Sequence, residues 1–261
     1  MTEEQWEACT EPAKMLEFLR DIGKASERKR RPFATGVARQ VWGMLAHQAA
    51  FQAVELAERF ADGDATEEEL DVAWHGLRLL PEYEGNLAIH AAAEALGSRA
   101  AARESLRSAP VYDLTYGPRA ERQWVLLGLT SGVVWASVGA VSRAAGDEAG
   151  GMVAVRATDA AKQHRERLCG LVRDIFGNPY KPLTPLSLSL LGWSDGLVVN
   201  LAEAAYQHRS LPSGHLENAR LAVLADALED AGCTDDRVLA HLRSPGPHVR
   251  GCVGVDAVLG K

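Results

Sequence analysis

The sequence lacks the short motifs that mark the common enzyme classes. It contains no Gly-x-Ser-x-Gly turn, no His-Glu-x-x-His pair, no Walker-type phosphate loop and no Gly-x-Gly-x-x-Gly after a predicted strand. These motifs carry the usual sequence signal for serine hydrolases, zinc proteases and nucleotide-dependent enzymes. In their absence we expect a non-enzymatic protein.

Positive charge is also scarce. The chain has 28 lysines and arginines against 35 aspartates and glutamates, so its formal net charge is −7. A general nucleic-acid binder normally presents a basic surface, and this balance argues against one. The single basic cluster, at 24–31, leaves open an alternative in which the protein is a nucleic-acid-associated factor. We favour a solvated helix start there, and the residues of the alternative are Lys24, Arg28, Lys29, Arg30 and Arg31.

Cysteine is sparse, with four residues and no Cys-x-x-Cys pair. The N-terminus is acidic, and the segment 6–9 is no apolar core of a signal peptide. We therefore expect a cytoplasmic protein with reduced thiols.

Runs of β-branched residues are scarce as well, and helical periodicity dominates. Leu221, Leu224, Ala225 and Leu228, for example, recur at the spacing of one helix face. The stretch 66–69 (Thr-Glu-Glu-Glu) predicts a capping box at a helix start. The fold class expected is all-α, an irregular bundle of roughly ten helices. Only 180–193, with its prolines and alternating leucines, favours extended structure.

Loop signals predict two halves. The segment 109–118, which begins near Pro110 and ends at Pro118, is the clearest loop and is expected to link an N-terminal half (1–108) to a C-terminal half (119–261). Near the start of the C-terminal half, 124–142 carries no charge and contains a Gly-x-x-x-Gly motif. The length of this segment and its glycine motif fit a membrane-spanning helix. The serines, the threonine and the glycines within the segment favour a buried central helix instead, so we expect no membrane partner.

Soft metal ligands gather near the C-terminus, at the spacing Cys-x7-His-x6-His-x3-Cys. Thiolate and imidazole groups at four positions suit tetrahedral zinc. If Pro247 opens the last helix, the two ligands that follow it are four residues apart and lie on one face. The spacing matches no standard zinc signature, and each residue also has an ordinary structural explanation. A zinc-binding protein or metal-dependent enzyme is therefore an alternative function, with no cofactor as the main expectation. Its ligands would be Cys233, His241, His248 and Cys252.

The C-terminus also resembles a known repeat. The segment VLAHLRSPGPHVRGCVGVDAVLG resembles a single HEAT-type repeat. It has an apolar helix, then a Pro/Gly turn, then a Val-Arg pair that opens a second apolar helix. The resemblance implies a helical hairpin at 234–260. Asp256, an acid among apolar neighbours there, is a candidate buried acid with a partner such as Arg250 or His248.

Longer segments resemble an uncharacterised bacterial family that is plentiful in planctomycetes. They are EEQWEACTEPAKMLEFLR at 3–20, ERFADGDATEEEL at 58–70, DIFGNPYKP at 174–182, and LADALEDAGC onward to VLGK. No activity is established for that family. From the repeat-like end, the acidic charge and the missing motifs, we expect a helical interaction module whose partner is another protein.

Overall fold

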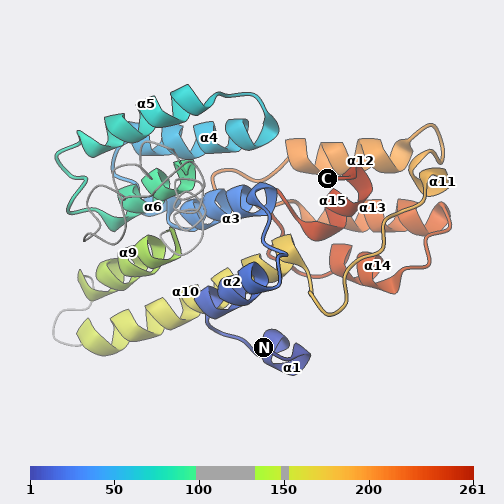
Figure 1. The fold of residues 1–261 in the computed structure, drawn as a ribbon, viewed down its shortest axis with the longest axis horizontal. Helices are drawn as coiled ribbons and strands as arrows, with labels where there is room; N and C mark the ends of the chain where they lie inside the picture. Colours follow the sequence, from blue (N-terminus) through green and yellow to red (C-terminus); the bar gives the residue numbers. More distant parts are fainter. Residues whose placement is uncertain (98–132, 148–152) are drawn as a thin grey trace, which may run out of the picture. The chain divides into compact units, whose positions relative to one another are not determined.

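All regular elements in the described part of the chain are helices. The computed structural model describes residues 1–97, 133–147 and 153–261. These residues form thirteen α-helices and one 3-10 helix, with two isolated β-bridges and no β-strand (Figure 1). The predicted all-α fold is confirmed.

Contacts along the chain define two compact units. Unit 1 comprises Met1–Ala8 and Gly170–Lys261, and unit 2 comprises Cys9–Cys169. The division falls within helix α10 (Val153–Phe176). The loop signals predict halves of 1–108 and 119–261, whereas unit 1 combines the first eight residues with those from Gly170 onward. The predicted linker at 109–118 lies outside the described residues.

Unit 2 is built around α6, which packs against α3, α4, α5 and α9. Helix α6 reads LAIHAAAEAL, and its alanines let neighbouring helices approach closely on several sides. Both of its ends are capped: the Asn86 side chain accepts from the amides of Ala88 and Ile89, and Gly97 ends the helix in the left-handed conformation. The elements of this unit before α10 are α2 (Pro12–Asp21), α3 (Glu27–Gln40), η1 (Trp42–Met44), α4 (Gln48–Asp62), α5 (Glu67–Arg78), α6 (Leu87–Leu96) and α9 (Val133–Asp147).

Helix α5 begins at the predicted capping box. The Thr66 hydroxyl accepts from the Glu69 amide at 3.2 Å, and the Glu69 carboxylate accepts from the Thr66 amide at 2.7 Å. The run of three glutamates is thereby explained as a helix start, where acidic side chains also complement the helix dipole.

Helix α9 covers the second part of the uncharged stretch 124–142. It packs against α6 and α3, with Val133, Ala136 and Ser137 buried and Trp135 exposed. Among the described residues, no helix is long and apolar enough to cross a membrane. The first part of the stretch, 124–132, lies outside the described residues.

A buried ion pair joins α3 to α4. The Arg39 guanidinium donates to the Glu58 carboxylate through two nitrogens, at 2.5 and 2.7 Å, and it also stacks over the Trp42 ring. Both charged side chains are almost fully excluded from solvent. The two-point geometry satisfies both carboxylate oxygens, which is what a buried pair requires.

Unit 1 has a core enclosed by four helices. Helix α12 packs against α13, α13 against α14, α14 against α15, and α15 against α12. Small and branched apolar side chains from all four fill the space between them. The helices of this unit, besides the end of α10, are α1 (Glu3–Glu7), α11 (Leu188–Leu191), α12 (Leu197–Gln207), α13 (Asn218–Asp230), α14 (Asp236–Leu242) and α15 (Val253–Leu259).

The N-terminal residues are tied to the end of α10 by polar contacts. Arg173 donates to the carbonyl oxygens of Trp6 and Glu7 at 2.8 and 2.9 Å, and Asn178 donates to the Glu7 carboxylate at 2.8 Å. The Arg173 contacts use carbonyls at the C-terminal end of α1, where a cation is favoured.

The final helix begins later than the sequence suggests. It starts at Val253 and not at Pro247, so that 243–252 is a loop between α14 and α15. The backbone of this loop is hydrogen-bonded to other segments: Leu216 donates to the His248 carbonyl, and the Val249 amide donates to Asp174. Gly251, at φ +91°, has a backbone conformation that a helix excludes.

The segment 180–193 was expected to be extended, but it forms no strand. It includes the four-residue helix α11, for which the Ser187 hydroxyl accepts from the Leu190 amide. The leucine alternation is therefore not a sheet pattern; Leu183, Leu186, Leu190 and Leu191 pack against the core of unit 1.

Candidate metal centre

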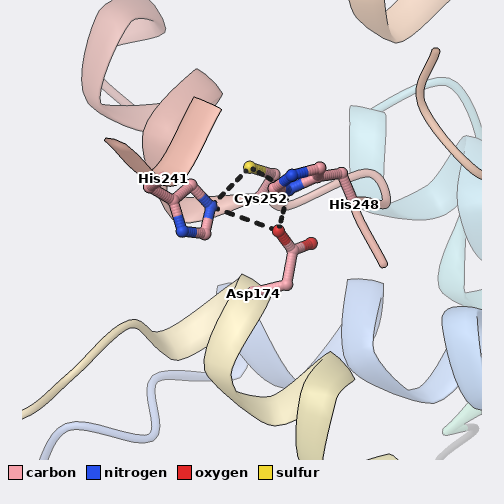
Figure 2. Close-up of side chains that lie close together, drawn as sticks. All are labelled: Asp174, His241, His248 and Cys252. Carbon is pink, nitrogen blue, oxygen red and sulfur yellow. Dashed lines mark hydrogen bonds and ion pairs between the residues drawn. The ribbon is translucent and has the colours of Figure 1, made fainter. Parts of the chain in front are cut away.

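Four buried or half-buried side chains of unit 1 converge on one point. Asp174, His241, His248 and Cys252 each direct one potential metal-ligand atom at the others, and these four atoms all lie within 4.8 Å of one another (Figure 2). Asp174, His248 and Cys252 are buried, and His241 is partly exposed. This is a concentration of polar groups that an apolar core does not tolerate unless they are paired or bind a ligand.

Three elements supply these side chains. Asp174 lies in the last turn of α10 and His241 in the last turn of α14, while His248 and Cys252 lie in the loop 243–252. The two loop residues are four apart in sequence, as in the helical arrangement considered above, but the loop and not a helix brings them together.

Four of the distances between these atoms are short, from 2.7 to 3.7 Å. Asp174 Oδ1 lies 2.7 Å from His248 Nδ1 and 3.2 Å from His241 Nε2. Cys252 Sγ lies 3.1 Å from His241 Nε2 and 3.7 Å from His248 Nδ1. Ligand atoms bound tetrahedrally to zinc at about 2.0–2.3 Å are about 3.3–3.7 Å apart, so small movements would accommodate the ion.

Atoms of these groups that do not face the centre are hydrogen-bonded to the protein. His248 Nε2 lies 3.1 Å from the Ser244 carbonyl oxygen, to which it can donate a hydrogen bond, so Nδ1 would be available to bind a metal in place of its hydrogen bond to Asp174. Asp174 Oδ2 accepts from the Val249 amide at 2.9 Å, leaving Oδ1 for the centre. Orientation of a ligand through its second polar atom is typical of metal sites.

The electrostatics favour a cation at the centre. Burial opposes ionisation of Asp174, but hydrogen bonds from His241 and His248 outweigh it and hold its pKa below the ordinary value. Burial would lower the pKa of His248, yet the hydrogen bond and the charge of Asp174 raise it. Burial, followed by the nearby Asp174, raises the pKa of the Cys252 thiol well above its usual range. A divalent ion is balanced in charge by one carboxylate and one thiolate, and it lowers the pKa of a coordinating thiol.

Glycine permits the position of His241. A Cβ atom at Gly254 would lie 2.9 Å from Cδ2 of His241 and 3.0 Å from Cδ2 of Leu242. The first turn of α15 can approach α14 this closely only because residue 254 has no side chain.

The same geometry does not suit a cysteine nucleophile. A Cys-His catalytic pair uses one imidazole nitrogen to accept the thiol proton and the other to contact an orienting group. Here a single nitrogen of each histidine, Nδ1 of His248 and Nε2 of His241, faces both Asp174 and Cys252. The thiol is fully buried and its pKa is raised, which disfavours the reactive thiolate.

No family model matches this chain, and the searches of curated proteins and of solved structures also found no match. The resemblance to the bacterial family stays a prediction.

Three of the four ligands expected from the sequence lie in this cluster, and Cys233 does not. Cys233 is buried in the core enclosed by α12–α15, and its amide donates to the Leu228 carbonyl at the end of α13. Gly232, at φ +92°, ends α13 and places Cys233 in that core, where a thiol packs as a small apolar group.

Asp174 takes the fourth position, which was not predicted from the sequence. It is separated from His248 by 74 residues, so no local spacing connects the two. Two features of the sequence marked it weakly. It is an acid at the edge of the apolar stripe formed by Leu168, Leu171 and Ile175, and it opens the segment DIFGNPYKP that carries the family resemblance.

The five basic residues considered for nucleic-acid binding do not form one exposed patch. Lys24 and Arg28 are exposed and Lys29 is half-buried, whereas Arg30 and Arg31 are buried. Arg31 donates to the Leu96 carbonyl at 3.3 Å and lies over the Phe60 ring at 4.3 Å. The second half of the cluster therefore packs inside unit 2.

Proposed function

We propose that the protein binds one zinc ion through Asp174, His241, His248 and Cys252, and that the ion stabilises unit 1. The observation that carries the proposal is the convergence of four donor atoms on one point, with other polar atoms of Asp174 and His248 held by hydrogen bonds. Two imidazoles, one thiolate and one carboxylate suit zinc better than magnesium or calcium, which prefer oxygen ligands only.

A structural role fits this donor set better than a catalytic one. Catalytic zinc usually has three protein ligands and one open position, whereas structural zinc is enclosed by four. The four donors here would complete a tetrahedron, and three of them come from buried residues. The proposal therefore agrees with the expectation of a non-enzymatic protein and makes the metal part of the fold.

Substitution of the ligands tests this proposal. We expect the purified wild-type protein to contain about one zinc ion per chain, and Asp174→Ala and Cys252→Ala each to reduce this to well below half. Elemental analysis after extensive dialysis measures the ratio.

Cys233→Ala is the matched control, because it removes a buried thiol of the same unit that lies outside the cluster. It should keep the wild-type zinc content. A wild-type protein without zinc that also fails to take it up on titration would contradict the proposal. Loss of zinc in Cys233→Ala with retention in Asp174→Ala would instead restore the ligand set expected from the sequence.

A further inference from the structure

A second buried polar group lies next to the loop that carries two of the proposed ligands. The Tyr206 hydroxyl, on α12, donates to Asp256 Oδ1 of α15 at 2.6 Å and accepts from the Gly251 amide at 3.1 Å. Its oxygen also lies 3.4 Å from the Cys252 carbonyl oxygen. Both side chains are almost fully buried.

These contacts act on the backbone immediately before the cysteine ligand. Gly251 has φ +91° and its amide has Tyr206 as an acceptor, while the Cys252 amide donates to the Val249 carbonyl. The direction of the Cys252 Sγ atom depends on this backbone. A short hydrogen bond from a hydroxyl to a carboxylate is strong, and it fixes the oxygen to which Gly251 is bonded.

Neither residue belongs to the group of four side chains whose ligand atoms converge. Burial of the Asp256 carboxylate costs desolvation free energy. Two apolar side chains would fill the same space without that cost. A function for the polar pair is to hold the loop in the one conformation that directs Cys252 at the metal. Outer groups of this kind typically change metal affinity by about 10–100-fold when they are removed.

We infer that Tyr206 and Asp256 are positioning residues of the zinc site, acting through the backbone of Gly251 and Cys252. The inference rests on the proposed function. It assigns a role to Asp256, for which the structure shows a hydrogen-bond partner, Tyr206, that the sequence did not suggest.

Cobalt(II) substitution tests the inference, because the visible spectrum of cobalt reports the geometry of its ligands and its bond to thiolate. Tyr206→Phe keeps the ring and removes only the hydroxyl. We expect this variant to bind cobalt with an altered spectrum and to bind zinc about 10–100-fold more weakly than the wild type, as measured by competition with a chromogenic chelator. Asp256→Asn keeps an acceptor oxygen for the hydroxyl and should retain the wild-type spectrum.

Val198→Ala is the control for a merely structural effect. Val198 is a fully buried residue of the same helix, and its truncation leaves a cavity that lowers the stability of unit 1 while the Tyr206 hydroxyl and Asp256 stay in place. It should keep the wild-type cobalt spectrum, even where weaker folding reduces the apparent zinc affinity.

A Tyr206→Phe protein with the wild-type spectrum, and with no greater loss of zinc affinity than Val198→Ala, would overturn the inference while leaving the zinc site intact. A wild-type protein that binds neither metal would overturn the proposed function itself. Should Tyr206→Phe fail to fold, Asp256→Ala removes the acceptor of the hydroxyl, and the same spectral change is expected there.

Discussion

Removal of the metal by a strong chelator is expected to abolish most of the hydrogen-exchange protection of α14, α15 and the loop between them. The proposed ion joins the end of α10 to α14 and to this loop, and both helices have only seven residues. Helices this short are not stable alone in water. Binding free energies of structural zinc are about 10–16 kcal/mol in zinc-finger peptides, and such energy is folding energy when no site exists in the unfolded chain.

The measurement is hydrogen–deuterium exchange followed by mass spectrometry, with and without chelator. Peptides from α3, α4 and α6 of unit 2 serve as the internal reference, because no proposed ligand lies in them. Their exchange should change little. If chelation of a zinc-loaded protein left the exchange protection of α14 and α15 unchanged, the prediction would be wrong. The hydrogen bonds among the four side chains would then be sufficient to hold these helices without a metal.

Glu58→Ala is expected to destabilise the protein by about 3–5 kcal/mol, because it removes the counter-ion of a buried guanidinium. Arg39 and Glu58 are 5% and 6% exposed, so water cannot replace the lost carboxylate. Urea denaturation followed by circular dichroism gives the change in the free energy of unfolding.

Two further variants distinguish the cost of leaving a buried charge unpaired from the cost of losing an ion pair as such. The double substitution Arg39→Met with Glu58→Leu replaces both charges by apolar groups and should be much less destabilising than Glu58→Ala. Asp21→Ala removes an exposed pair with Arg20, which has side-chain exposures of 51% and 63%, and should cost less than about 1 kcal/mol. A loss for Glu58→Ala as small as that for Asp21→Ala would contradict the account of a buried pair.

Much of the fold could be predicted because its signals are local. The Thr66 capping box, the stop at Gly232 and the apolar stripe from Leu221 to Leu228 depend only on neighbouring residues, and the structure confirms all three. The start of the last helix could not be predicted. It depends on hydrogen bonds that His248 and Val249 make with residues far away in sequence, and these hold 247–252 as a loop.

The candidate site was predictable only in part, for the same reason. His241, His248 and Cys252 lie close together in the sequence, so their clustering was visible as spacing. Asp174 is on another helix, and only the tertiary fold shows that it replaces Cys233. The expected protein partner and the HEAT-type resemblance of the hairpin stay predictions, since neither follows from the arrangement of these side chains.

The central claim is the identity of the four ligands, and X-ray absorption at the zinc edge tests it most directly. We predict a four-coordinate ion with one sulfur at about 2.3 Å and three nitrogen or oxygen neighbours at about 2.0–2.1 Å, two of them with the outer scattering of imidazole. Two sulfur neighbours, or a six-coordinate shell of oxygen and nitrogen alone, would contradict the assignment of Asp174, His241, His248 and Cys252 as the ligands.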